Sequence, residues 1–245
     1  MAFITTDIQG AVALVRLSRP EKRNAMTPEM LLSLHEAIVS PPNAARVIVI
    51  CGEGQSFSAG FDLAMCKADP SGKTMAALLE RLSSCLVAMR ASVLPVIVAA
   101  HGVAVAGGCA LLAAADFVVA DRACKVGYPV VRIGVSPAVN APFVQLAMGN
   151  GPMRERLLDT ALIPASQAAG LVHELVESPD DVLPAAIRLA QTLAEKGPTA
   201  IAATKTLLRD IEGLNGPEGT RRALAASLAL VGGDEERERL GALKV

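Results

Sequence analysis

The chain has 245 residues, of which 52% are hydrophobic and only 2% are aromatic. Its 23 basic and 24 acidic residues give a net charge of −1, so no basic excess is present to neutralise a nucleic-acid backbone, and few aromatic rings are present to stack on bases. This length is enough for one large domain or two small ones, and we expect a core of Ala, Val, Leu and Ile and no nucleic-acid partner.

The N-terminal third predicts strands alternating with a helix. Residues 11–17 (AVALVRL) form an apolar run of strand length, and residues 46–50 (RVIVI) have the continuous apolar pattern of a strand covered on both faces. Between them, Thr27-Pro28-Glu29 is a typical helix start, with Thr as N-cap and Pro in the first turn. After the second strand we expect a glycine-containing loop to Leu63 and then a mobile loop over residues 64–75.

The longest uncharged segment covers residues 91–115, a length that ordinarily suggests a membrane span. Pro95, His101 and three glycines interrupt it, and its character changes from Val-rich to Ala- and Leu-rich at the glycines. We predict a buried strand over 96–100, a glycine turn, and a buried helix ending near Ala115. An amphipathic helix is expected just before, over residues 75–91, and no membrane span.

The second half of the chain continues the alternation and then becomes helical. Ser166 and Gly170 are predicted to start and stop a helix. The remaining expected elements are a strand over 116–120, a loop-rich segment over 126–142, helices from about residue 143, a strand over 171–176, and helices over 183–196, 198–211 and about 217–231. Strands alternating with helices predict an α/β fold with a largely parallel sheet. The C-terminal helices are expected to form a separate layer that serves assembly.

The cysteines predict neither disulfides nor a metal site. The five of them are odd in number and widely spaced, without a CxxC pair or a supporting His cluster: Cys51, Cys66, Cys85, Cys109 and Cys124. Buried, reduced thiols fit a cytoplasmic protein, and the N-terminus lacks the pattern of a signal peptide.

Two strand-to-loop junctions end in glycines, Ala59-Gly60-Phe61 and Ala106-Gly107-Gly108. Glycine lets the backbone turn its N–H groups toward a ligand, and a helix N-terminus adds positive potential. Two such N–H groups converging on one oxygen would form an oxyanion hole. The alternative, that both junctions are ordinary turns, stays open on composition alone.

Two other motifs are incomplete. Gly102 and Gly107 have the spacing of the glycines in a phosphate-binding loop, but Gly108 and Cys109 follow where Lys and Ser/Thr are needed, so nucleotide hydrolysis is not supported. Ser58 and Gly60 complete half of a GxSxG nucleophile elbow, whose first glycine is replaced by serine, so a serine hydrolase is disfavoured.

Several motifs together resemble the crotonase superfamily, also called the enoyl-CoA hydratase/isomerase family. Residues 19–25 (RPEKRNA) are similar to its RPxxxNA, residues 57–63 (FSAGFDL) to its FSAGxDL, and residues 101–109 (HGVAVAGGC) to its NGxAxGGG. Later landmarks also match, at 116–120, 131–134 and 165–172. The resemblance runs from about residue 5 to residue 210.

This resemblance implies a fold, a ligand and an assembly. The fold would be a crotonase-like spiral of ββα units over 1–195, with a helical C-terminal part over 196–245, all within one unit spanning 1–245. The ligand would be an acyl-CoA thioester, acting as substrate with no further cofactor. Homotrimers or hexamers would form, with the C-terminal helices in the contacts.

The resemblance also assigns roles to residues. The N–H groups of Phe61 and Gly107 would hold the thioester oxygen and stabilise an enolate. The backbone along the path of the CoA would come from Lys22, Arg23, Ala25, Ala59, Asp62 and Leu63.

The departures from the family pattern concern acid/base chemistry. The two glutamates with which the family's hydratases activate water would stand at Ala110 and Val130, and a glutamate of another isomerase subgroup at Ala138. Methyl and isopropyl groups cannot move a proton, so ordinary hydratase rates are not expected. Tyr128, Asn140 and Asp69 are candidate replacements, although packing or solvation also explains each of them.

Two functions therefore stay open. The first is an enzyme on CoA thioesters, a lyase or isomerase of fatty acid metabolism with nonstandard acid/base residues. The second is a non-catalytic acyl-CoA-binding or assembly protein.

Overall fold

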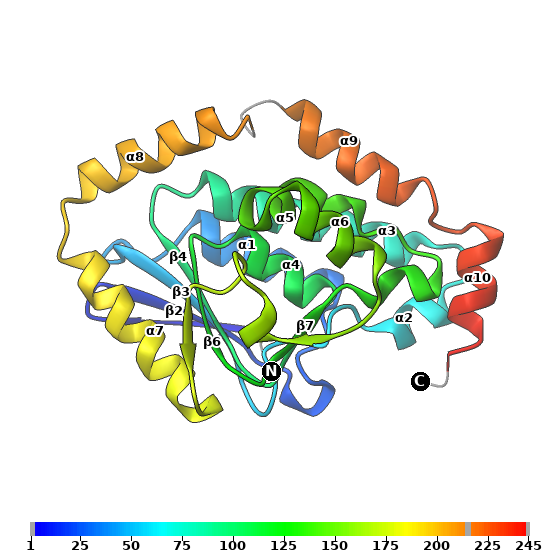
Figure 1. The fold of residues 1–245 in the computed structure, drawn as a ribbon, viewed down its shortest axis with the longest axis horizontal. Coiled ribbons are helices and arrows are strands. Elements are labelled where there is room, and N and C mark those ends of the chain that lie inside the picture. The colour runs from blue at the N-terminus through cyan, green and yellow to red at the C-terminus, as the bar shows by residue number, and fades with distance from the viewer. Residues whose placement is uncertain (1–2, 214–216, 244–245) are drawn as a thin grey trace.

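A computed structural model describes residues 3–213 and 217–243, and a six-stranded sheet runs through its centre (Figure 1). The order is β1-β2-β3-β4-β6-β9; β1 is antiparallel to β2, and each later neighbouring pair is parallel. The bounds are β1 (Ile4–Gln9), β2 (Val12–Leu17), β3 (Val47–Gly52), β4 (Val96–Ala100), β6 (Phe117–Asp121) and β9 (Glu174–Val176). The predicted α/β class with a largely parallel sheet is confirmed.

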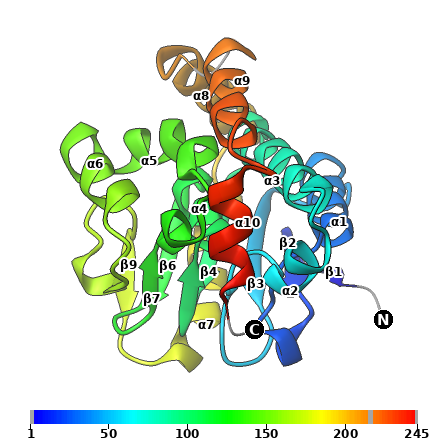
Figure 2. The ribbon, with the colours of Figure 1, turned by 90° about the vertical axis from the view of Figure 1, so that its right-hand side faces the viewer.

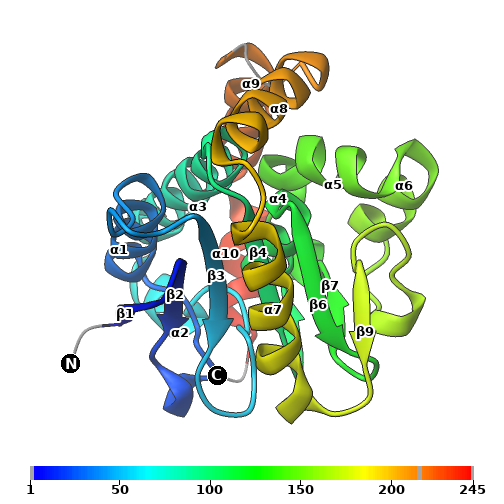
Figure 3. The same ribbon diagram turned by 90° about the vertical axis from the view of Figure 1, so that its left-hand side faces the viewer.

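Helices cover both faces of this sheet, which explains its continuous apolar strands. The face under α1 (Pro28–Val39), α3 (Lys73–Ala91) and α4 (Gly107–Ala114) receives every second residue of the central strands β2, β3, β4 and β6, such as Val15 of β2. The residues between them, such as Leu14, pack under α7 (Pro179–Ala194), which lies alone across the other face in Figure 3. This alternation follows from the two-residue period of a strand.

A second sheet of three short strands lies beside the first. It has the order β5 (Val103–Val105), β7 (Lys125–Gly127) and β8 (Ile163–Pro164), with β5 parallel to β7 and β7 antiparallel to β8. The uncharged segment over 91–115 is thus β4, β5 and α4, with a strand inside the predicted glycine turn. Within the described ranges, no helix is long and apolar enough to cross a membrane.

The prediction of a mobile loop over residues 64–75 is wrong. Residues Leu63–Ala68 form α2, and α3 begins at Lys73. The Asp62 carboxylate starts α2 by accepting the N–H groups of Ala64 and Met65, at 3.2 and 3.4 Å. A two-turn helix with such a cap lacks the long apolar period by which helices are recognised in sequence.

The region after β6 is built from short helical segments. These are η2 (Pro129–Ile133), η3 (Pro137–Asn140), α5 (Ala141–Met148), α6 (Asn150–Leu158) and η4 (Ala165–Gln167), with η1 (Pro20–Lys22) near the N-terminus. The helix predicted to start at Ser166 is the single 3₁₀ turn η4, and Gly170 follows it with a φ of +84°. The predicted loop over 126–142 contains β7, η2 and η3.

The last three helices of the described residues are α8 (Pro198–Ile211), α9 (Pro217–Leu228) and α10 (Asp234–Gly241). In Figure 1, α8 and α9 lie above the helices α3, α4 and α5, on the side of the sheet away from α7. Figure 2 shows α10 in front of α4. Helix α9 packs on α3 and η3, and α10 packs on α2 and η2. Along α8, Leu207, Leu208 and Ile211 are 58%, 45% and 72% exposed.

Candidate functional site

The two glycine junctions lie against each other. Ser58 pairs with Ala104 in a parallel bridge, in which the Ser58 N–H donates to Val103 O at 3.0 Å and the Val105 N–H donates to Ser58 O at 3.1 Å. Two residues further on, Gly60 has a φ of +89°, and a Cβ on it would lie 2.9 Å from the Ala106 Cβ. The close approach therefore requires glycine at position 60.

This contact brings two unpaired main-chain donors together. Phe61 lies opposite Met26 in a parallel bridge, but both hydrogen bonds of this bridge are made by the residues on either side of Phe61. The Met26 N–H donates to Gly60 O at 2.7 Å, and the Asp62 N–H donates to Met26 O at 3.0 Å. Gly107 is the first residue of α4, whose first-turn N–H groups have no partner within the helix. Within residues 3–213 and 217–243, the N–H groups of Phe61 and Gly107 have no hydrogen-bond acceptor.

The turn that presents Gly107 is strained. Ala106 has a φ of 51° and a ψ of −118°, a region that non-glycine residues rarely occupy and that costs about 1–3 kcal/mol. Hydrogen bonds hold it there, since the Ala106 N–H donates to Gly127 O at 2.8 Å and Ala106 O accepts the Ala110 N–H at 3.0 Å. The strained residue is the one that directly precedes α4 and presents its N-terminus.

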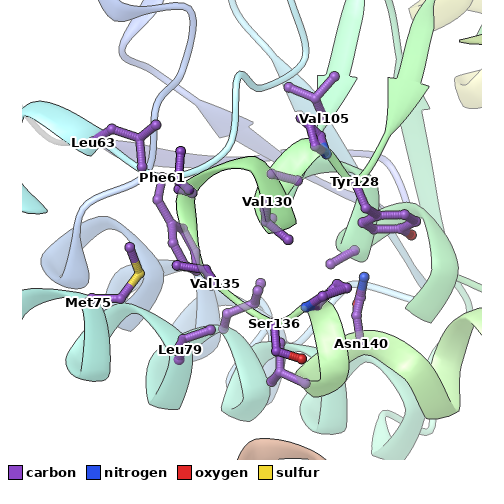
Figure 4. A pocket seen from close by; sticks show the side chains of 18 of the residues that line it. Phe61, Leu63, Met75, Leu79, Val105, Tyr128, Val130, Val135, Ser136 and Asn140 are labelled. Carbon is purple, nitrogen blue, oxygen red and sulfur yellow. The ribbon is translucent and has the colours of Figure 1, made fainter. Parts of the chain in front are cut away.

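Both donor residues open on an apolar cavity of about 250 Å³ (Figure 4). Ala110 and Val130 line this cavity, whereas Ala138 lies between two residues that do. Hydrophobic side chains from α3, η2, η3 and the C-terminal segment form most of its wall: Leu63, Met75, Leu79, Leu82, Val105, Ile133, Val135, Val139 and Leu243. Among the lining residues that the structure describes there is no Asp, Glu or His.

Two of the six residues expected along the CoA path, Ala59 and Leu63, belong to the lining of this cavity. The Ala59 N–H donates to Arg23 O at 2.9 Å, which ties the loop of Lys22, Arg23 and Ala25 to the Phe61 junction. The Asp62 carboxylate is occupied, because it caps α2 and pairs with the Arg19 guanidinium at 2.8 Å.

Asn24 organises this loop and was missed by sequence reasoning. It is fully buried with a φ of 52°, and its side-chain oxygen accepts the Arg19 N–H at 2.8 Å. Its amide nitrogen donates to Glu53 O and Ser56 O, each at 2.8 Å. The asparagine inside the RPEKRNA motif was the available signal, because Asn tolerates left-handed backbone and its amide can bond on both sides.

The three acid/base candidates do not come together. Tyr128 and Asn140 line the cavity, and the Tyr128 hydroxyl donates to Cys109 O at 3.1 Å. Burial raises the pKa of Tyr128 well above its usual range, so the phenol is protonated at neutral pH. Asp69 lies instead in a separate hollow beside α10, where hydrogen bonds from Ser71 and Thr74 lower its carboxyl pKa to about 2.

The five cysteines are free and buried, as predicted. Burial raises the pKa of the Cys109 thiol, next to the glycine turn, to about 11, so the thiolate nucleophile is absent at neutral pH. No group of three or more His, Cys, Asp or Glu side chains within the described part of the chain is placed to hold a metal ion.

Comparison with known proteins identifies the family of the chain. Residues 7–226 match the sequence profile of the family described as Enoyl-CoA hydratase/isomerase. The chain is 31% identical to the 2,3-dehydroadipyl-CoA hydratase of Escherichia coli, over 85% of this chain and 82% of that protein. It is 30% identical to the crotonyl-CoA hydratase of Syntrophomonas wolfei, over 79% of this chain and 76% of that protein.

Solved structures with a similar fold also include members of this family. An enoyl-CoA hydratase/isomerase from Mycobacterium paratuberculosis superimposes with a TM-score of 0.89 over 99% of both chains, at 24% identity. The α/β fold with its C-terminal helices is therefore the crotonase fold. With the profile match and the relatives above, the chain belongs to the enoyl-CoA hydratase/isomerase family of the crotonase superfamily.

Proposed function

We propose that the protein binds an acyl-CoA thioester with its carbonyl oxygen on the N–H groups of Phe61 and Gly107. The observation that carries the proposal is the pair of unpaired N–H donors at the edge of one apolar cavity. The CoA part follows the loop of Lys22, Arg23 and Ala25 and the segment of Ala59, Asp62 and Leu63.

Two donors on one oxygen stabilise the negative charge of a thioester enolate. The apolar wall excludes water, and in a low-dielectric site each hydrogen bond to a charged oxygen is stronger than in water. The positive end of α4 adds to this effect, since Gly107 is its first residue. The site is therefore suited to reactions that pass through an enolate, or to holding a thioester without reaction.

The acid/base groups decide between these two functions. At the two positions expected to carry the hydratase glutamates, the cavity has the side chains of Ala110 and Val130. An enzyme would need to use Tyr128 and Asn140, although burial raises the pKa of the Tyr128 phenol and makes it a weak proton donor, and its O–H already donates to Cys109 O. The absence of a lining carboxylate among the described residues favours the second candidate, a non-catalytic acyl-CoA-binding protein.

An assay of the purified protein on a panel of saturated and enoyl-CoA thioesters tests both functions. We expect binding by isothermal titration calorimetry, and hydration of crotonyl-CoA at least about 10²-fold slower than a family member with both glutamates, because general acid/base catalysis is lost. Binding without turnover across the panel would exclude the enzyme. Failure to bind any thioester would contradict both functions.

We also propose that α8 serves assembly into a homotrimer or hexamer. Its exposed residues Leu207, Leu208 and Ile211 form an apolar stripe that a partner subunit would bury. Light scattering should give a trimeric or hexameric mass, and Leu207→Glu with Ile211→Glu should lower it. Light scattering that gives a monomeric mass for the wild type would contradict this proposal.

A further inference from the structure

One polar side chain in the cavity wall has no partner in the protein. Asn140 is 2% exposed, and its Oδ1 is buried without a hydrogen bond. Within the described residues its amide nitrogen donates no hydrogen bond either, and although Asn140 directly precedes α5, its side chain does not cap that helix. Figure 4 shows the side chain pointing from the end of η3 toward Tyr128, across the cavity from Phe61.

An unpaired buried amide is destabilising. Leaving a buried donor or acceptor unsatisfied costs about 1–3 kcal/mol, and an apolar side chain of the same shape avoids that cost. The neighbouring cavity positions Val130, Val135 and Val139 are all apolar. Ser136, the nearby polar residue of this wall, has its hydroxyl engaged, because it accepts the Ala138 N–H at 3.2 Å. Folding therefore does not explain the carboxamide at position 140, whereas a ligand does.

We propose that Asn140 recognises a neutral oxygen carried by the acyl group in addition to the thioester, as in a keto- or hydroxyacyl-CoA. This inference rests on the proposed function, because it requires the acyl group to occupy the cavity. A carboxamide donates to a keto oxygen, and it both donates to and accepts from a hydroxyl. The Tyr128 hydroxyl donates its hydrogen bond to Cys109 O, so its oxygen is available as a further acceptor for a ligand hydroxyl.

The neutral class follows from the charge of the wall. An amide pairs with a neutral oxygen without leaving a net charge in the cavity, whereas a carboxylate next to Asn140 would be buried without a counter-charge. Arg132 also lines the cavity, but this residue is exposed to solvent. A plain hydrocarbon acyl group would leave the Asn140 amide unsatisfied in the complex.

The test compares three ligands of equal chain length: butyryl-CoA, 3-oxobutyryl-CoA and 3-hydroxybutyryl-CoA. Calorimetric titration of the wild type should show the two oxygenated ligands binding about 5–150-fold more tightly, the range that corresponds to one satisfied buried polar group. Asn140→Leu keeps the branching and the number of side-chain heavy atoms but removes the polar atoms, so it should lose this preference and bind butyryl-CoA at least as tightly as the wild type. Gln145→Leu removes the carboxamide of an exposed residue of α5 outside the cavity lining; it is the matched control and should keep the preference.

Each result has one meaning. If Asn140→Leu weakens all three ligands equally, Asn140 only shapes the cavity and the inference is overturned. If 4-carboxybutyryl-CoA binds more tightly than 3-oxobutyryl-CoA, the ligand class is wrong. If the wild type binds none of the thioesters, the proposed function itself has failed. Asn140→Ala repeats the comparison should the leucine variant not fold.

Discussion

Replacing Gly107 with proline should lower turnover about 10²–10³-fold, or lower affinity correspondingly for a ligand that is bound without reaction. Proline lacks an N–H, so the variant removes one of the two proposed donors, and loss of one such donor has this typical size. The position suits the experiment, because Gly107 is the first residue of α4 and proline is compatible with the first turn of a helix. Steady-state kinetics or calorimetry on the best thioester of the panel measures the effect.

Gly107→Ala is the matched control for this experiment. A Cβ at position 107 would lie 2.7 Å from the Met26 Cε and 3.1 Å from a Phe61 ring carbon, so both variants crowd the same two side chains. The alanine variant keeps the N–H, and the difference between the variants therefore reports the donor. Thermal unfolding shows whether both are folded. Wild-type binding and turnover by a folded proline variant would refute the assignment.

Introducing a glutamate at one of the expected hydratase positions should raise the rate of hydration, whereas Gly107→Pro should lower turnover. Val130→Glu places a carboxyl group in the cavity wall at one of the positions expected to carry a hydratase glutamate. Hydration of crotonyl-CoA should rise, and with Ala110→Glu added the gain should approach the about 10²–10⁴-fold that general acid/base catalysis typically contributes. The double change carries the larger folding risk, because Ala110 is 1% exposed and a second buried carboxylate is costly.

A neighbouring position separates catalysis from a general charge effect. Val131→Glu adds the same side chain one residue further along η2, at a position that does not line the cavity. It should leave hydration unchanged. If Val130→Glu binds thioesters and still hydrates crotonyl-CoA no faster than Val131→Glu, the prediction for the single change is wrong, because a carboxylate at position 130 alone does not restore hydration.

The sequence predicts the fold well where one element carries a strong local pattern. The apolar runs of β2, β3 and β4 and the Thr27 cap of α1 are such cases, and each element lies within a few residues of its predicted range. The pattern fails for elements that exist only through tertiary contacts. Most residues of helix α10 are charged, only Glu236 and Leu240 of it are buried, and the helix packs on α2 and η2. Three-residue strands such as β5 and β7 are too short for a periodic signal.

The site was predictable in part. The glycine junctions were identified from local sequence, but their contact depends on the Ser58–Ala104 bridge, which joins residues far apart in the chain. No periodicity encodes such a pairing. The unpaired state of the Phe61 N–H likewise depends on which groups of Met26 are used by its neighbours. For Asn140, local sequence cannot tell whether a buried amide finds a partner, because the partners would come from other segments.

The proposed donors have a consequence for how this protein can change over generations. The N–H groups of Phe61 and Gly107 belong to the main chain, and among the encoded residues proline alone lacks that group. Nearly every missense change at these two codons therefore retains the hydrogen, whereas single changes at codons 110, 130 and 140 give or remove a reactive side chain. Single substitutions can therefore add or remove acid/base groups in this cavity while both proposed main-chain donors are retained, provided that the Met26 and Phe61 side chains accommodate any Cβ at position 107.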